Sequence, residues 1–330
     1  MNVLVTGGTG YIGSHTCIEL MECGHSVIIL DNLCNSSETV NQAIDQITQK
    51  EHTFYKGDLL DEQILDRVFC ENKIDAVIHF AGLKAVGESV EMPLAYYHNN
   101  ITGTLQLLKA MQKHGCKKIV FSSSATVYGV PKAVPICEDF PLSTTNPYGS
   151  TKLMIEQILK DLYQSDNTMD ITILRYFNPV GAHDSGLIGD NPTHPNNLMP
   201  RIVDVALGKT RALTVFGTDY PTRDGTGVRD YIHVVDLALG HIKALEYQDG
   251  LRIYNLGTGN GQSVFELVHT FERVNNVSIP CDLLPRRPGD VAECYADASK
   301  AKKEIDWEAS RDLDSMCKSS WEFALKCKMG

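Results

Sequence analysis

The pair Tyr148 and Lys152 has the residue types and the spacing of a catalytic base and its activator. Residues four positions apart lie on one face of a helix. A neighbouring ammonium stabilises a phenolate, so a tyrosine in such a pair can remove a proton near neutral pH. The pattern alone leaves one alternative open, which is a pair on the exposed face of a surface helix.

The same pattern occurs a second time, in Tyr128 and Lys132. Pro131 lies inside this second match and disfavours a regular helical turn there. After Tyr148, apolar residues continue at helical spacing: Leu153, Ile155, Ile158 and Leu159. We therefore predict that Tyr148, and not Tyr128, is the base.

A glycine-rich loop near the start of the chain could cradle a pyrophosphate. It satisfies GxGxxG with Gly8, Gly10 and Gly13, and GxxGxxG with Gly7, Gly10 and Gly13. Glycines allow backbone amides to approach a phosphate at the positive end of the helix that follows. Asp31 ends the next predicted strand, where a carboxylate binds ribose hydroxyls and repels a 2′-phosphate. The loop and Asp31 together predict NAD rather than NADP, whereas the loop alone could be a simple turn.

A third polar group follows the fifth predicted strand, in the stretch from Phe121 to Gly129. Sites on parallel sheets lie at the carboxyl ends of the strands, so Ser124 is placed to face a substrate. A polar turn without a function is the alternative, because serines are common in turns.

These groups are separated by segments that alternate between strand and helix. The predicted strands are apolar throughout, as in a parallel sheet covered on both faces: 3–5, 27–30, 53–55, 76–80, 118–121 and 171–174. Helical patterns run between them, as in 94–114 and 150–163. The alternation predicts an α/β fold of the Rossmann type, with a doubly wound parallel sheet.

The pattern changes near residue 178, where prolines and glycines crowd together up to Pro200. Such a density suggests a boundary and a loop that faces the substrate. We predict a dinucleotide-binding domain over 1–177 and a smaller mixed α/β substrate domain over 178–330, with segments such as 212–216 and 264–273. Later segments could return to pack on the first domain.

Composition excludes several classes of protein. The net charge of −11 argues against a general nucleic-acid or anionic membrane surface, and no apolar run is long enough to cross a bilayer. The first apolar stretch is too short for a secretory signal. Ten scattered cysteines without a CxxC or a ligand-like cluster indicate reduced thiols and no metal site. We therefore expect a cytoplasmic protein.

The glycine loop, Ser124 and the YxxxK motif, in this order, resemble the extended short-chain dehydrogenase/reductase superfamily. Within it, stretches spread from residue 1 to about residue 301 resemble the UDP-glucose 4-epimerase family. These stretches are GYIGSHT, ILDNLCNS, HFAGLKAVGES, FSSSATVYG, LRYFNPVGAH, NNLMP, DGTGVRDYIHV, IYNLG and ADASKA.

The resemblance implies a role for each matching residue. Tyr148 would be the base, Lys152 its partner on the nicotinamide ribose, and Ser124 a hydrogen-bond partner of the sugar O4. The implied cofactor contacts are Gly7, Gly10, Tyr11, Ile12, Gly13, Asp31, Asn32, Leu33, Cys34, Asn35, Ser36, Asp58, Leu59, Phe80, Ala81, Gly82, Leu83, Lys84, Asn99, Ser124, Tyr148, Lys152 and Phe177. The implied substrate contacts are Lys84, Ser124, Tyr148, Asn178, Asn197, Leu198, Phe216, Arg229, Arg287, Asp290 and Cys294. Arginines suit a diphosphate, and we interpret Arg286 as ordinary surface charge.

The implied reaction interconverts UDP-galactose and UDP-glucose. The sugar is oxidised at C4, the 4-keto sugar rotates, and the hydride returns to its other face from an NAD that stays bound. The resemblance also implies a homodimer that packs through the helices of 94–114 and 150–163, although both helices could instead be buried within one subunit. Rivals are a nucleotide-sugar 4,6-dehydratase, which would carry an acidic pair where this chain has Ala125 and Thr126, and a non-catalytic NAD-binding sensor.

Cys294 leads to a hypothesis about substrate breadth. Many bacterial relatives carry a tyrosine beside the sugar pocket two residues before the alanine that opens ADASKA. An alignment without gaps places Cys294 there, next to Tyr295. The smaller thiol would leave room for an N-acetyl group on C2, so the chain would also accept UDP-GalNAc and UDP-GlcNAc. A buried cysteine with no such role, or a one-residue slip in the alignment, is the alternative.

Overall fold

The fold is built around one seven-stranded parallel sheet. A computed structural model describes residues 1–192, 195, 197–247, 249–287 and 289–329. The strand order is β10-β6-β5-β4-β1-β2-β3, and every pairing is parallel. The strands are β1 (Asn2–Thr6), β2 (Ser26–Asp31), β3 (Thr53–Lys56), β4 (Ala76–His79), β5 (Lys118–Ser124), β6 (Asp170–Tyr176) and β10 (Leu251–Leu256). The chain order reverses between β1 and β4, which is where doubly wound sheets bind their ligands.

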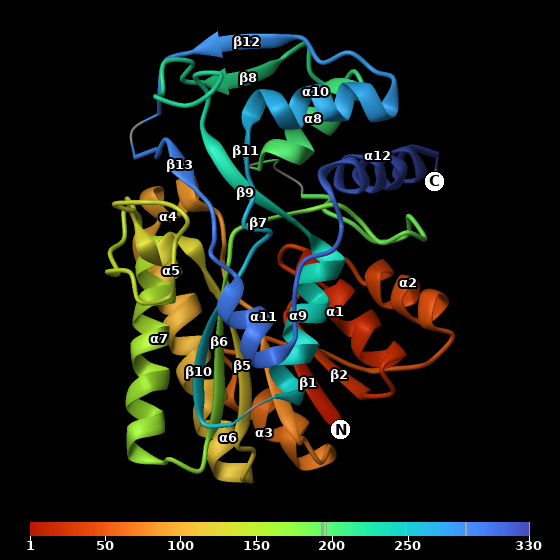
Figure 1. The fold of residues 1–330 in the computed structure, drawn as a ribbon. Helices are drawn as coiled ribbons and strands as arrows, with labels where there is room; N and C mark the ends of the chain where they lie inside the picture. Colours follow the sequence, from red (N-terminus) through yellow and green to blue (C-terminus); the bar gives the residue numbers. More distant parts are fainter. Residues whose placement is uncertain (193–194, 196, 248, 288, 330) are drawn as a thin grey trace.

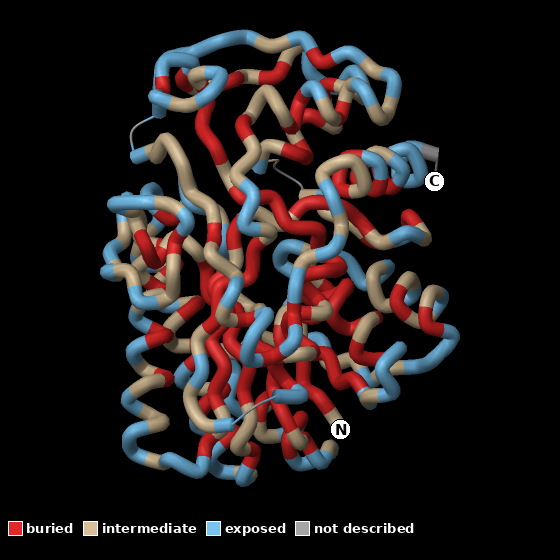
Figure 2. The backbone as a smooth tube through the Cα atoms, in the orientation of Figure 1, coloured by how far each residue is buried: buried red, intermediate tan, exposed pale blue. Residues whose placement is uncertain are grey.

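Helices cover both faces of this sheet (Figure 1). One face packs against α1 (Tyr11–Glu22), α2 (Thr39–Thr48) and α9 (Val234–Glu246). The other face packs against α3 (Glu62–Glu71), α6 (Gly103–His114) and α7 (Pro147–Ser165). Side chains alternate along β5, so Ile119 and Phe121 join the second layer whereas Val120 joins the first. The inner strands β1, β4 and β5 are accordingly buried along most of their length, whereas the edge strand β3 is not (Figure 2).

The predicted helix over 94–114 is interrupted. It consists of α5 (Pro93–Tyr97), the π-helical turn η1 (His98–Thr102) and α6, preceded by the short α4 (Val86–Glu91). Such a turn widens the helix by one residue and is frequent at functional sites. Apolar periodicity predicted the extent of the helix but could not reveal the extra residue. The predicted strand over 76–80 ends one residue early, because Phe80 already belongs to the following loop.

A smaller lobe stands above the carboxyl ends of the large sheet (Figure 1). Strand β9 (Val228–His233) pairs with β7 (Asn178–Val180), β11 (Gly261–Ser263) and β13 (Glu293–Cys294), and β8 (Leu213–Phe216) pairs with β12 (Cys281–Leu284). The helices α8 (Leu198–Ala206), α10 (Val264–Asn275) and α12 (Leu313–Met329) share a separate core with these strands. The short α11 (Ser299–Ile305) lies beside β10.

The chain crosses between the two lobes more than once. It leaves the large sheet after β6 and returns to it with α9 and β10. The division into 1–177 and 178–330 remains a prediction about where the chain first leaves that sheet. None of the helices built from the described residues has both the length and the apolar character that spanning a bilayer requires.

Candidate active site

The glycine loop joins β1 to α1 and leaves the start of that helix open. A Cβ on Gly13 would lie 2.2 Å from the Gly7 carbonyl oxygen, and one on Gly7 would lie 2.7 Å from the Ala81 nitrogen. Only glycine therefore fits these two positions. Gly10, the N-cap of α1, provides no side-chain hydrogen bond to the first turn. The uncapped amides can donate to a pyrophosphate, which fits the dinucleotide predicted for this loop.

Asp31 ends β2 and ties the loop to the strand ends. Its Oδ2 accepts a hydrogen bond from the Thr9 amide at 3.1 Å, and its Oδ1 accepts one from the Leu33 amide at 2.8 Å. Next to it, the Asn32 Nδ2 donates to Asp58 at 2.8 Å. The structure thus gathers predicted cofactor residues from the ends of β2 and β3 around the glycine loop.

The segment after β4 is held by a residue that the sequence analysis missed. The Asn100 side chain, in the π-helical turn, accepts from the Leu83 amide at 2.8 Å and donates to the Leu83 carbonyl at 3.0 Å. It also donates to Thr151 in α7 at 3.1 Å and accepts from the predicted contact Asn99 at 2.9 Å. Two adjacent asparagines, which are poor helix formers, in the middle of a predicted helix are the signal that could have identified it.

Ser124, Tyr148 and Lys152 meet where β5 ends and α7 begins. The N-cap Asn146 accepts a hydrogen bond from the Gly149 amide at 2.8 Å, and Pro147 occupies the first turn, so α7 begins directly before Tyr148. Tyr148 and Lys152 are 8% and 5% exposed, which rules out the surface pair left open by the pattern. The Lys152 ammonium donates to the Ser122 carbonyl at 2.8 Å and lies 5.9 Å from the centroid of the Tyr148 ring.

Burial sets the proton affinities of this pair. It raises the pKa of Tyr148 to about 12, against a lowering effect of a side-chain hydrogen bond with Ser124. Burial also lowers the pKa of Lys152 to about 8, against a raising effect of the Glu156 charge. In the protein alone, the enclosed phenol loses the hydration that would stabilise its charged form, so its pKa lies above the ordinary tyrosine value.

The second YxxxK match has no helical register. The 3₁₀ turn η2 (Ala125–Tyr128) ends at Tyr128, and Gly129 follows with a φ of 59°. The Tyr128 hydroxyl is buried, where it donates to Asn255 at 2.7 Å and accepts from Arg175 at 3.0 Å. It is therefore a structural residue with satisfied hydrogen bonds.

The predicted substrate residues lie mostly in the smaller lobe. The Arg287 guanidinium lies 4.7 Å from the centroid of the Phe216 ring and donates to Asp290 at 3.0 Å. Cys294 in β13 pairs with Arg229 in β9, whose guanidinium donates to the Val291 carbonyl at 2.9 Å. These residues form two groups, each with one arginine.

Three further predicted substrate residues occupy element ends: Asn178 begins β7, and Asn197 and Leu198 begin α8. Asn196 of the NNLMP stretch lies outside the described residues. Arg286, interpreted as surface charge, stacks on Tyr220 at 4.1 Å and donates to Asp219 at 2.7 Å.

Two links between the lobes have no signal in the sequence. Asp190 is surrounded by Tyr11, Lys84 and Asn197; burial raises its pKa, whereas the Lys84 charge and a hydrogen bond with Asn197 lower it. The Tyr11 hydroxyl donates to the Gly181 carbonyl at 2.7 Å, and the Gly181 amide donates to Ser320 in α12 at 3.1 Å. The C-terminal helix thereby supports the loop beside Tyr11, a predicted cofactor contact.

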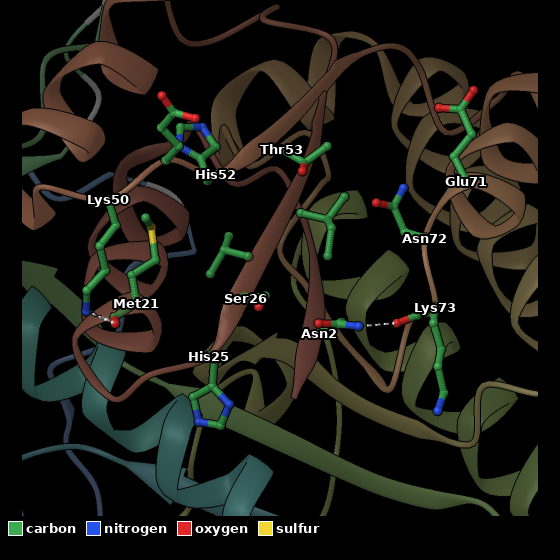
Figure 3. Close-up of a pocket in the computed structure, with 13 residues that line it drawn as sticks. Asn2, Met21, His25, Ser26, Lys50, His52, Thr53, Glu71, Asn72 and Lys73 are labelled. Atoms are coloured by element: carbon green, nitrogen blue, oxygen red, sulfur yellow. Dashed lines mark hydrogen bonds between the residues drawn. The ribbon is translucent and has the colours of Figure 1, made fainter.

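A hollow of about 580 Å³ lies at the opposite, amino-terminal edge of β1, β2 and β3 (Figure 3). Two of its lining side chains donate to backbone carbonyls of the same hollow: Lys50 to Met21 at 2.5 Å, and Asn2 to Lys73 at 2.8 Å. Parallel sheets bind ligands at their carboxyl edge, so we assign no chemistry to this hollow.

One group of metal-ligand types occurs among the described residues, namely Asp66 and Cys70 in α3 and His114 at the end of α6. The Asp66 carboxylate already accepts from Lys113 at 2.6 Å and from His114 at 2.8 Å. The lysine neutralises the carboxylate that a cation would need, so this group supports no metal site.

Sequence comparison relates this chain to a family of enzymes. The model of the family described as GDP-mannose 4,6 dehydratase, which represents extended short-chain dehydrogenase/reductases, matches residues 4–320. The UDP-glucose 4-epimerase of Bacillus subtilis is 61% identical over 98% of this chain and 96% of the relative. That of Pasteurella multocida is 57% identical over 100% of this chain and 99% of the relative.

Solved structures share the whole fold. The UDP-glucose 4-epimerase of Bifidobacterium longum in complex with NAD⁺ and UDP superposes with a TM-score of 0.96 at 54% identity, covering 99% of this chain and 98% of that one. The enzyme of Stenotrophomonas maltophila with bound NAD and formylated UDP-arabinopyranose has a TM-score of 0.98 at 49% identity, covering 100% of this chain and 99% of that one.

Proposed function

We propose a mechanism from the premise that this chain belongs to the UDP-glucose 4-epimerase family, an isomerase family of extended short-chain dehydrogenase/reductases. The chain uses NAD to interconvert UDP-galactose and UDP-glucose. The observation that carries this function is the burial of Tyr148, Lys152 and Ser124 together at the carboxyl end of β5, in a chain that matches these enzymes over its full length.

The cofactor would lie across the carboxyl ends of the strands. The amides at the start of α1 would hold its pyrophosphate, Asp31 the adenosine ribose, and Lys152 the nicotinamide ribose. When bound, NAD supplies the acceptor for the C4 hydride and a positive ring whose charge favours the Tyr148 phenolate. That charge matters here because burial alone keeps the phenol protonated.

The chain's own residues would move the proton and orient the sugar. Tyr148 takes the proton from the sugar O4 during oxidation and returns it during reduction. Ser124 donates to the same oxygen and keeps it within reach of the phenol. Lys152 stays charged beside the phenol and is fixed by the Ser122 carbonyl at 2.8 Å. The sugar must turn over between the two half-reactions, so this end of the site has to bind it loosely.

The nucleotide must be held firmly while the sugar turns. We propose that Arg229 and Arg287 bind the diphosphate, because guanidinium groups match two phosphate oxygens at once. Phe216, which already supports Arg287 at 4.7 Å, would face the uridine. Asn178, Asn197, Leu198 and Asp290 complete the proposed set.

Cys294 supports a broader choice of sugar. It is half-buried and packs at the edge of a cluster that contains Phe177 and Val127, next to the catalytic strand end. A thiol at this wall leaves more space than a phenol ring. We keep the proposal that UDP-GalNAc and UDP-GlcNAc are also substrates.

A homodimer in the cytoplasm fits the surface and the composition. Large apolar side chains are exposed together on and between α4, α5, α6 and α7: Val86, Val90, Met92, Leu94, Leu105 and Met154. Such a patch marks a protein interface, and it lies on the helices proposed to pair. The scattered free thiols suit a reducing compartment.

The rival functions lack support. A 4,6-dehydratase needs an acid and a base where Ala125 and Thr126 stand, and neither side chain titrates. A non-catalytic sensor would not need a buried Tyr148, Lys152 and Ser124 together.

The direct test is to incubate the purified protein with UDP-galactose and no added nucleotide. Formation of UDP-glucose is expected. Elimination to a 4-keto-6-deoxy sugar, or binding of NAD without turnover, would select one of the rivals.

A further inference from the structure

The helix that carries the catalytic pair also carries a buried carboxylate. Glu156 lies one turn after Lys152 and two turns after Tyr148, so it shares their face of α7. Its side chain is 0% exposed. A charge so deeply buried needs partners, and these partners connect the helix to the sheet.

Two neighbouring strands supply the hydrogen-bond partners of Glu156, and the Lys160 ammonium, one turn further along α7, lies 3.8 Å from its Oε2. The Ser123 hydroxyl, on β5, donates to Glu156 Oε1 at 2.6 Å. Arg175, on β6, donates from Nε to Oε1 at 2.9 Å and from Nη2 to Oε2 at 2.6 Å. Ser123 and Arg175 face each other across the two strands. One carboxylate therefore joins α7 to both strands directly beside Ser124.

Arg175 also donates hydrogen bonds to groups other than Glu156. Its Nη1 donates to the Tyr128 hydroxyl and to the Glu138 carbonyl, each at 3.0 Å, and the Tyr128 hydroxyl donates to Asn255 on β10. The carboxylate thus rests on a continuous buried network that reaches the edge strand. Such a fully paired network fixes one arrangement of its members.

We propose that Glu156 is a positioning residue of the epimerase reaction, which locks the Tyr148–Lys152 face of α7 onto the ends of β5 and β6 through Ser123 and Arg175. This inference rests on the proposed function, because Tyr148 and Lys152 must be the reacting pair.

Charge gives Glu156 a second effect on the same pair. The groups that face Lys152 are Tyr148 and Glu156 on α7, the Ser122 carbonyl and the Phe121 ring on β5, and His79 on β4. Burial holds His79 neutral by lowering its pKa to about 3. Glu156, whose carboxylate also faces Arg175 and Lys160, is the acidic group that raises the pKa of Lys152. Without it, Lys152 would lose its proton at lower pH.

The test compares Glu156→Gln with two other variants, using the holoenzyme and UDP-galactose. Ser123→Ala removes one hydrogen bond and leaves the ion pair with Arg175 intact. Asp236→Asn is the matched control. Asp236 is also a buried carboxylate and pairs with Arg311 at 2.5 Å, but it lies on α9, away from Tyr148.

In Glu156→Gln we expect bound NAD and a KM close to the wild-type value, while kcat falls about tenfold or more. The fall of kcat on the basic side of its pH profile (the basic limb) should begin at a lower pH than in the wild type. Ser123→Ala should show a smaller loss of kcat in the same direction. Asp236→Asn should lower the melting temperature and leave kcat and the basic limb in place.

A Glu156→Gln protein that melts earlier but keeps the wild-type kcat and basic limb would overturn the proposal, since Glu156 would then be only structural. If that variant does not fold, Ser123→Ala decides, and a wild-type kcat in it overturns the proposal equally. A wild-type protein that does not turn over UDP-galactose would instead refute the proposed function.

Discussion

The substitution Tyr128→Phe separates the two YxxxK matches by their physical roles. It removes a hydroxyl that donates to Asn255 at 2.7 Å and accepts from Arg175 at 3.0 Å. Arg175 keeps its bonds to Glu156 and to the Glu138 carbonyl, whereas the Asn255 oxygen is left without this donor in a buried site. An orphaned buried acceptor costs about 1–3 kcal/mol of unfolding free energy.

For a chain of this length, that loss lowers the melting temperature by about 2–4 °C. Activity should change far less than it does when a general base is lost, which costs about 10²–10⁴ in rate. The assay is thermal unfolding at saturating NAD together with kcat for UDP-galactose. An unchanged melting temperature with a kcat loss of 10² or more would refute the reasoning, because Tyr128 would then act in the chemistry.

Three further predictions concern the cofactor, acid stability and substrate breadth. Because Asp31 ends β2 beside the glycine loop, the nucleotide released on denaturation should be NAD, and recovery of NADP would contradict this assignment. Burial lowers the pKa values of His15 and His79 to about 3 and that of His241 to about 4, whereas unfolded histidines titrate near 6.5. The unfolded chain then binds more protons, so stability is lost as the pH falls below about 6.5, by about 1.4 kcal/mol per pH unit for each histidine. Urea unfolding between pH 7 and pH 5 measures this slope, which His241→Asn should reduce by about 1 kcal/mol per pH unit on average, because the unfolded histidine is only partly protonated near pH 6.5; an equal slope in the variant would contradict it. Finally, Cys294→Tyr should selectively lose turnover of UDP-GalNAc, and a wild type that converts only the unsubstituted sugars would show that the pocket proposal is wrong.

Much of the fold could be predicted because its signals are local. Continuous apolar runs predicted the six strands from β1 to β6, and glycine spacing predicted the loop before α1. The i, i+4 spacing of Tyr148 and Lys152 and the proline in the rival match distinguished the helix from the turn. In each of these cases, residues close in sequence determine the structure.

The remaining features depend on contacts between distant residues. The bond from Gly181 to Ser320 joins residues 139 positions apart, and Glu156 meets Arg175 19 positions away on another element. The π-helical turn around Asn100 depends on the Leu83 backbone and on Thr151. The raised pKa of Tyr148 also follows from enclosure by the folded chain, which the YxxxK motif does not encode.

The most direct test of the central claim is the turnover of UDP-galactose by Tyr148→Phe, compared with the wild type, without added nucleotide. This change removes one hydroxyl from a buried ring and leaves the glycine loop and Asp31 intact. We predict that NAD remains bound while epimerisation falls by about 10²–10⁴. Near-wild-type formation of UDP-glucose by the variant would contradict the assignment of Tyr148 as the base.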